Sequence, residues 1–389
     1  MSPPGRPKGE FRSAQHEGTP VRQRRDLLTP LWRHTRTAPQ FSVRDWERVI
    51  GQARRTRLLA RLAQHCIDLD LVAQLPAGAW RHLASELVLV QRQRAAVHWE
   101  LDCITRALAA LDTPVVLLKG AAYLMADLPA SRGRVFNDID ILVDRRQIDA
   151  VESALMAAGW IAQERDAYNQ RYYRTWMHEL PPLRHVTRHS VIDVHHTITP
   201  PTSRFAVDGG LLLQHVRPLR PGSPLAVLQP LDMVLHSAAH LFGEGEFDHG
   251  LRDLLDMDDL LLHFQATEPD FWPRLLQRAA VLGLQVPLYH ALMQVQRLFG
   301  TTPPPAVAAA VQALQPNAVA RLAMGWALGQ ALQPMHPSCD TASTAVARFA
   351  LYVRSHWIRM PAHLVLRHLL RKAWMQAFPP KDANPTLSV

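Results

Sequence analysis

The chain has 389 residues, of which 48% are apolar, and a formal net charge of +9. This composition excludes a largely disordered chain, and no uninterrupted apolar run approaches the ~18–20 residues that a membrane span requires. The basic N-terminus lacks the apolar segment of a secretory signal, and Cys66, Cys103 and Cys339 are too few and too widely spaced for a disulfide framework. We therefore expect a cytoplasmic protein.

Residues 1–38 are expected to form a flexible basic tail, because six of the first 25 residues are Lys or Arg. A second basic cluster, Arg367, Arg371 and Lys372, lies near the other end. No basic strip interleaved with aromatic residues indicates a nucleic-acid interface. Nonspecific nucleic-acid binding through these basic ends stays an alternative, and it predicts a steep loss of affinity with salt.

Residues 39–112 are predicted to form an N-terminal helical region. Apolar residues from Trp46 to Leu62, and again from Leu83 to Val97, recur at intervals of three and four, the period of a helix that buries one face. Pro76 and Gly78 separate the two stretches.

Residues 113–225 change character and are predicted to form a catalytic core of mixed sheet and helices. Strands are expected at 114–118 and 137–143, with a short helix at 121–127 between them. A helix at 145–158 should follow, capped by Asp144, and then a hairpin whose second strand is 190–196.

Residues 226–378 are predicted to form a C-terminal helical region of five or six helices, followed by a tail at 379–389. The helices are expected at 231–241, 250–264, 271–282, 287–299, 305–332 and 343–378, some of them kinked. The overall prediction is an α+β fold, mainly helical, in which helical regions flank a small mixed sheet.

Asp138 and Asp140 alternate with Ile139 and Ile141 in the most informative stretch of the chain. Side chains alternate faces along a strand, so the two carboxylates share one face while the isoleucines enter the core. Like charges roughly 6–7 Å apart repel each other unless a cation lies between them. The pair therefore predicts a divalent-metal site of the kind used in phosphate chemistry, and a solvated edge strand is the alternative.

Asp193 is a third acidic residue on an otherwise apolar strand, and His195 shares its face. If this strand lies beside the Asp138–Asp140 strand, three carboxylates converge on one place. The third carboxylate would then bind metal or act as a general base. A surface aspartate in a hairpin is the alternative interpretation.

Lys119 stands out because the chain has only four lysines and this one ends an apolar strand beside Gly120. A compact ammonium at a strand-to-helix turn suits a phosphate group. Lys119 could instead form a structural salt bridge with Asp138 or Asp140. Arg132 and Arg134, in the following loop, are either solvated or in contact with phosphate.

Three further groups have weaker signals. His236 and His240 lie four residues apart on a helix and are best interpreted as a structural pair, because the zincin glutamate is absent. Asp256, Asp258 and Asp259 are predicted to lie on a solvated helix face. A histidine–aspartate phosphohydrolase is disfavoured, since the chain has no His-Asp dipeptide.

Taken together, the segments Leu117–Gly120, Asn137–Val143 and Ile192–His195 resemble the uncharacterised bacterial nucleotidyltransferase family of the DNA polymerase beta-like superfamily. The likeness extends over residues 45–265 and includes His240 and Asp253, which it places at the cleft. It implies transfer of a nucleoside monophosphate from an NTP such as ATP to a hydroxyl acceptor, with Mg²⁺ or Mn²⁺. Asp138, Asp140 and Asp193 would be the catalytic metal ligands, and Lys119, Gly120, Arg134 and His195 would bind the nucleotide.

The chain departs from the superfamily at the turn that holds the triphosphate, where the usual Gly-Ser is Gly120-Ala121. A noncatalytic module that binds a nucleotide or a partner protein is therefore the alternative function. The sequence does not define the acceptor, which could be a small molecule, a protein or an RNA.

Overall fold

The computed structural model describes residues 26–33, 40–111, 113–164, 166–243, 245 and 247–361. The basic clusters at 1–25 and 367–372, the end of the last predicted helix and the tail at 379–389 lie outside these residues. Residues 26–33, within the region predicted as a tail, are packed, and Leu28 is fully buried beside the 3₁₀ turn η1 (Thr29–Trp32).

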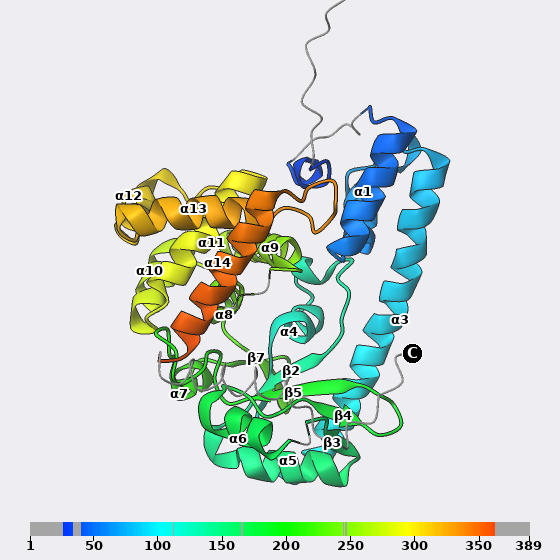
Figure 1. Cartoon of the computed structure of the whole chain (residues 1–389). Helices are drawn as coiled ribbons and strands as arrows, with labels where there is room; N and C mark the ends of the chain where they lie inside the picture. The colour runs from blue at the N-terminus through cyan, green and yellow to red at the C-terminus, as the bar shows by residue number, and fades with distance from the viewer. Residues whose placement is uncertain are drawn as a thin grey trace, which may run out of the picture.

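The N-terminal helices form a bundle on one side of the molecule, in blue and cyan in Figure 1. Ser42 begins the first helix with a capping box that it shares with Asp45. The helices are α1 (Val43–Arg55), α2 (Leu59–Asp68) and the 31-residue α3 (Ala77–Ala107), with the 3₁₀ turn η2 (Val72–Gln74) before α3.

One mixed sheet of seven strands forms the centre of the fold, with the order β3-β4-β5-β2-β1-β7-β6. Its central strands are buried on both faces, which matches their run of apolar residues. The strands are β1 (Val115–Leu117), β2 (Ile139–Leu142), β3 (Trp160–Ala162), β4 (Leu183–His185), β5 (Val191–His195), β6 (Arg217–Pro218) and β7 (Leu225–Val227).

The register of the sheet aligns the acidic strands. β5 runs parallel to β2, and Asp193 lies directly opposite Asp140. On the other side β2 pairs with β1 in antiparallel fashion, so β2 is an interior strand and not the solvated edge of the alternative interpretation. Beyond β1 lies β7, which pairs with it in parallel.

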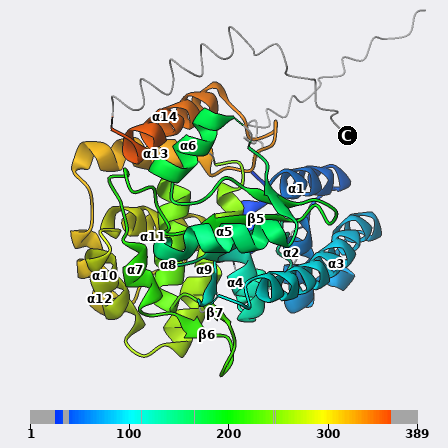
Figure 2. The ribbon, with the colours of Figure 1, turned by 90° about the horizontal axis from the view of Figure 1, so that it is seen from below.

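Short helices connect the strands. Figure 2, from below, shows α5 lying across the sheet, and α4 lies between the sheet and the helices above it in Figure 1. Asp144 caps a 3₁₀ turn, η4, at the point where the helix was predicted to begin. These elements are α4 (Lys119–Met125), η3 (Pro129–Ser131), η4 (Arg145–Gln147), α5 (Ile148–Ala157), α6 (Ala167–Trp176) and α7 (Gly209–Leu213).

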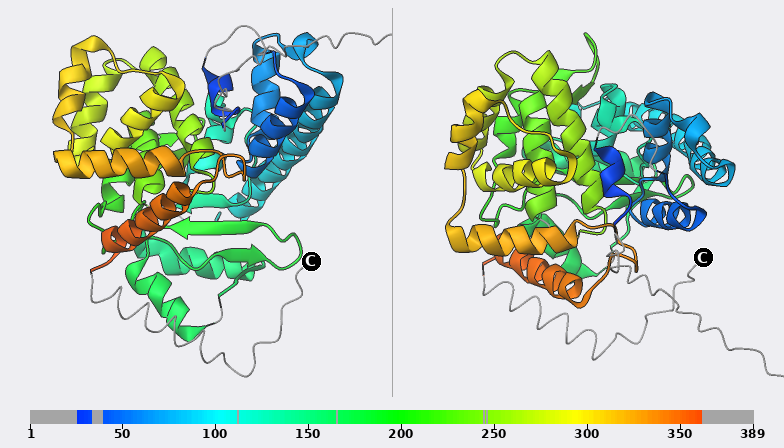
Figure 3. Two further views of the ribbon diagram at one scale, coloured as in Figure 1. Left: turned by 45° about the horizontal axis from the view of Figure 1, so that its top comes forward. Right: turned by 90° about the horizontal axis from the view of Figure 1, so that it is seen from above.

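The C-terminal helices pack over the sheet opposite α5, and Figure 3 shows α14 crossing them in orange. The predicted helix at 305–332 is two helices, interrupted near Pro316 because proline lacks the backbone N–H that a helix needs. The helices are α8 (Pro230–Gly243), α9 (Gly250–Thr267), α10 (Phe271–Val281), α11 (Gln285–Phe299), α12 (Pro305–Ala313), α13 (Ala318–Ala331) and α14 (Ala342–Arg359).

The α+β, mainly helical fold predicted from the sequence is confirmed. The predicted hairpin is present as antiparallel β4 and β5. Among the described residues, no helix is both long and apolar enough to cross a bilayer. The positions that matter for the site follow from this fold: β2 and β5 lie side by side, and α8 and α9 face them.

Candidate functional site

The three predicted carboxylates come together at β2 and β5. Asp140 is 5% exposed, whereas Asp138, just before the strand, opens to solvent. Asp193 is half-buried on the neighbouring strand, at the same level as Asp140. Because paired residues of parallel strands project to the same side, Asp140 and Asp193 face the same side of the sheet.

Two basic side chains, Lys119 and His195, contact Asp140. Lys119 Nζ donates to Asp140 Oδ1 at 3.1 Å, and His195 Nε2 lies 3.1 Å from the same oxygen. Burial alone would raise the pKa of Asp140, but Lys119 and then His195 outweigh it and hold this pKa well below its usual range. Asp140 is therefore ionised throughout the neutral range. The salt bridge considered for Lys119 is present.

The pKa values of Asp193 and Asp138 are instead raised by their surroundings. Burial first, and then the negative charges of Asp140 and Glu179, raise the pKa of Asp193 to about 7. Asp193 Oδ1 has no hydrogen-bond partner in the described part of the chain. Desolvation in the cleft and the charge of Asp140 also raise the pKa of Asp138. This side of the site thus has more negative charge than its own cations neutralise.

His195 is almost fully buried, and its ring connects two acids. Burial would lower its pKa, but the hydrogen bond to Asp140 and the charge of Glu179 outweigh it and raise this pKa. Its hydrogen bond thereby fixes the orientation of the Asp140 carboxylate.

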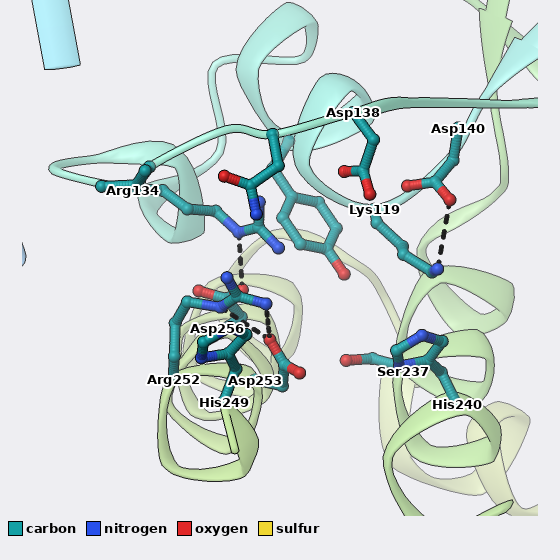
Figure 4. A pocket seen from close by; sticks show the side chains of 13 residues that line it. Lys119, Arg134, Asp138, Asp140, Ser237, His240, His249, Arg252, Asp253 and Asp256 are labelled. Carbon is teal, nitrogen blue, oxygen red and sulfur yellow. Dashed lines mark hydrogen bonds and ion pairs between the residues drawn. The ribbon is translucent and has the colours of Figure 1, made fainter. Parts of the chain in front are cut away.

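A cavity of about 160 Å³ lies between the sheet and the C-terminal helices. Figure 4 shows Lys119, Asp138 and Asp140 on one side, with residues of α8 and α9 facing them. We call these the sheet wall and the helical wall. The cavity is lined by Lys119, Tyr123, Arg134, Val135, Asn137, Asp138, Asp140, Ser237, His240, His249, Arg252, Asp253 and Asp256.

Arginine side chains form ion pairs with the aspartates of the helical wall. Arg252 donates to Asp253 Oδ1 through Nη2 at 2.7 Å and through Nε at 2.8 Å. Asp256 accepts from Arg134 Nε at 2.8 Å and also pairs with Arg61 from α2. The ion pairs of this wall are therefore formed by residues from three parts of the chain.

The solvated face predicted for Asp256, Asp258 and Asp259 is wrong. Asp256 and Asp258 are buried, and Arg61 pairs with both Asp256 and Asp259. Charged side chains are seldom buried unless they are paired, and here the partner comes from the N-terminal helices. The acidic cluster therefore holds the N-terminal bundle against α9.

Arg134 also explains why residue 120 is glycine. A Cβ atom added at Gly120 would collide with the Arg134 guanidinium and lie 3.1 Å from the Phe136 ring. Gly120 is buried and does not line the cavity. Its lack of a side chain therefore makes room for Arg134, which reaches Asp256 on α9.

His236 and His240 make a perpendicular ring contact, with centroids 6.4 Å apart, as the structural interpretation predicts. His236 is buried and burial lowers its pKa far below normal, whereas His240 lines the cavity. Asp253 also lines the cavity, so the two residues that the resemblance placed at the cleft are both there.

The structure thus brings six of the seven predicted site residues to or directly behind the cavity: four line it, and Asp193 and His195 lie beside Asp140 on β5. Sequence reasoning did not identify Ser237, His249 and Arg252. Ser237 lies three residues before His240 on α8, so helical spacing from His240 could have indicated it. No comparable spacing signal indicated Arg252, which is adjacent to Asp253 in sequence.

The donor set of the sheet wall fits a divalent cation. Mg²⁺ and Mn²⁺ prefer oxygen ligands, which Asp138, Asp140 and Asp193 supply. Asp193 Oδ1 is buried without a hydrogen-bond partner among the described residues, so the fold does not already use this oxygen and it fits a cation ligand.

The sheet wall therefore combines carboxylate oxygens that can hold a divalent cation with a lysine, a set of groups that suits phosphate chemistry. The chain belongs to the family described as uncharacterised nucleotidyltransferase, whose model matches residues 42–300. No curated protein and no solved structure matches it. Family membership supports nucleotidyl transfer as the general chemistry of the protein.

Proposed function

We propose that the protein transfers a nucleoside monophosphate from an NTP to a hydroxyl acceptor, with Mg²⁺ or Mn²⁺ held by Asp138, Asp140 and Asp193. The observation that carries this proposal is the register of β2 and β5, which sets Asp193 opposite Asp140 beside a cavity that Lys119 also lines. When bound, the ion would act as a Lewis acid that neutralises phosphate charge.

The cavity suits the phosphates of the donor. Its volume of about 160 Å³ is below the ~300–1,000 Å³ of pockets that enclose a whole drug-sized ligand, so the nucleoside would extend beyond it. Lys119 Nζ is 3.1 Å from Asp140 and reaches the cavity, where it would contact a phosphate oxygen as a point charge.

The remaining residues orient the reactants. His195 holds the Asp140 carboxylate through Nε2, while Arg252 on the opposite wall is held in place by Asp253. In the reaction the acceptor hydroxyl oxygen forms a bond to the α-phosphorus and its proton passes to Asp193 or to solvent. The bond between the α-phosphorus and the oxygen that bridges to the β-phosphate breaks, and pyrophosphate leaves. Ser237 and His240 are the polar groups of α8 that would meet the acceptor or the nucleoside.

A noncatalytic binding module is the second candidate, and one observation favours it. Arg134 is committed to Asp256, and Gly120 accommodates Arg134, so two residues predicted to bind the triphosphate already have roles in the fold. Such a module would bind NTP without releasing pyrophosphate.

The test uses NTPs labelled at the α-phosphate, Mg²⁺ or Mn²⁺, and cell lysate as the source of acceptor, with products sorted by size. We expect transfer by the wild type and a loss of at least about 100-fold in Asp138→Asn, because the ion loses a direct ligand. Asp149→Asn, an exposed aspartate on α5, is the matched control. Equal transfer by Asp138→Asn and wild type would refute the site, and calorimetric binding of Mg·NTP without transfer would favour the module.

A further inference from the structure

The short segment between α6 and β4 lies along the end of β5 and carries two residues that neither wall of the cavity uses. His178 O accepts from His196 N at 2.9 Å, and Leu180 N donates to Val194 O at 2.9 Å. Glu179 and His195 form an isolated antiparallel bridge. The backbone thus brings His178 and Glu179 against His195.

Three potential ligands converge there. His195 Nδ1 lies 3.4 Å and His178 Nε2 3.9 Å from the same oxygen, Glu179 Oε2. One ligand atom from each of the three residues lies within 4.8 Å of the other two. His195 is fully buried, and the other two side chains are less than one-fifth exposed.

The hydrogen bonding of His195 defines which of its nitrogens is available. The Asp140 carboxylate can only accept, so Nε2 carries the proton of that 3.1 Å hydrogen bond. In the neutral ring Nδ1 then presents a lone pair toward Glu179. The Nδ1 atoms of both His195 and His178 are buried without a hydrogen-bond partner among the residues described.

The separation of 3.4 Å between His195 Nδ1 and Glu179 Oε2 fits a bridging metal ion better than a bridging proton. It exceeds the 2.7–3.2 Å of an N–H···O hydrogen bond, so a proton on Nδ1 would bridge the two atoms poorly. Tetrahedral Zn²⁺ with bonds of about 2.0–2.2 Å places its ligand atoms roughly 3.4 Å apart. Rotation of the His178 side chain would close the longer 3.9 Å separation.

We propose that His178, Glu179 and His195 form a separate site for a transition-metal dication of the Zn²⁺ type, behind Asp140. Two imidazole nitrogens and one carboxylate favour Zn²⁺ or Co²⁺ over Mg²⁺. Asp140 accepts from the Nε2–H of a ligating histidine, which is the usual arrangement that fixes the orientation of a metal-bound imidazole. The ion would pin the segment at 177–180 to β5 and thereby hold Asp140 in place.

The test uses Co²⁺ as the probe, since its visible absorption reports nitrogen ligation in a tetrahedral site. The full-length protein, stripped with chelator, is titrated with Co²⁺ in excess Mg²⁺, and then with Zn²⁺. We expect one tightly bound Co²⁺ that excess Mg²⁺ does not displace and that one equivalent of Zn²⁺ removes. Absence of this signal in the wild type would overturn the proposal and leave a protonated His195 between Asp140 and Glu179.

Variants locate the ion. His178→Ala and the isosteric Glu179→Gln should each abolish the signal, and Asp140→Asn should weaken Co²⁺ binding about 10- to 100-fold. His98→Ala, an exposed histidine on α3, is the matched control and should bind as the wild type does. Circular dichroism checks the fold of each variant, and Glu179→Gln decides if His178→Ala does not fold.

Asp138→Asn separates this proposal from nucleotidyl transfer. It removes a residue of the proposed nucleotidyl site but none of the three ligands, so it should retain the Co²⁺ signal while losing transfer. Loss of the signal in Asp138→Asn would assign the ion to the sheet wall and refute the separate site. Retention in both His178→Ala and Glu179→Gln would refute it as well.

Discussion

Aspartates lie on both sides of the cavity, but they differ in how their charges are neutralised. On the helical wall, Asp253 and Asp256 accept charged hydrogen bonds from Arg252 and Arg134, and Arg61 adds a second partner for Asp256. On the sheet wall, Asp140 has two basic neighbours, Lys119 and His195, and beside it on β5 Asp193 Oδ1 has no hydrogen-bond partner among the described residues. We therefore interpret the aspartates that pair with arginine as structural, and the group around Asp193, whose Oδ1 has no partner among the described residues, as the proposed functional one.

The largest expected effect is on the helical wall. Asp256→Asn leaves Arg61 and Arg134 buried without the shared carboxylate, which should lower the free energy of unfolding by about 3–5 kcal/mol. Asp138→Asn, in the open sheet wall, should change it by less than about 1 kcal/mol. Urea denaturation measures both, with Asp149→Asn as the surface control. If Asp256→Asn unfolds at the same urea concentration as that control, the ion pairs of Asp256 with Arg61 and Arg134 do not stabilise the fold.

The next effect concerns pH and Asp193. Its pKa is raised to about 7 by burial and then by Asp140 and Glu179, so the unfolded chain loses this proton at lower pH than the folded protein. The stability contributed by protonated Asp193 is therefore fully present below its unfolded pKa and is lost as the pH rises to about 7.

Asp193→Asn copies the protonated form at every pH. In chelator, its advantage in unfolding free energy over the wild type should grow from pH 5 to pH 7 and then level off, reaching on the order of 2 kcal/mol. Parallel urea titrations at each pH measure this difference. A difference in unfolding free energy that stays constant with pH would contradict a raised pKa of Asp193 in the folded protein.

The last prediction concerns Gly120→Ala, which tests whether Asp256 holds Arg134 in place over Gly120. Gly120→Ala drives a methyl group into the guanidinium that Asp256 holds, and overpacking of this kind costs about 1–3 kcal/mol. Gly325→Ala on α13 meets no atom within 4 Å and should instead stabilise the protein by about 0.5–1 kcal/mol. Thermal melts of the two variants should shift in opposite directions, and equal shifts would contradict this account of Gly120.

The sheet wall was predictable because its signals are local. The alternation of Asp138 and Asp140 with isoleucines fixes their face, and the strand around Asp193 repeats that pattern. The sequence alone could not show that β5 pairs with β2 in the register that aligns Asp140 with Asp193. That register depends on packing between strands about fifty residues apart.

The helical wall was harder to predict because its partners are distant in sequence. Arg61 and Asp256 are separated by 195 positions, so three nearby aspartates on a helix resembled a solvated face. Gly120 resembled a phosphate turn, although the reason for its small size is Arg134. His178 and Glu179 lie in a segment whose residues have neither helical nor strand periodicity, and tertiary contacts, including two backbone hydrogen bonds, place it along β5.

The pairing of β7 with β1 has a practical consequence for anyone who shortens the chain. A fragment ending at residue 225, the end of the core predicted from sequence, would lose Ala226 and Val227 from β7. The buried strand β1 would then become an edge with unsatisfied backbone N–H and C=O groups, which invites pairing with another molecule. Such a fragment should aggregate, and a shortened chain should therefore keep all of β7, up to Val227.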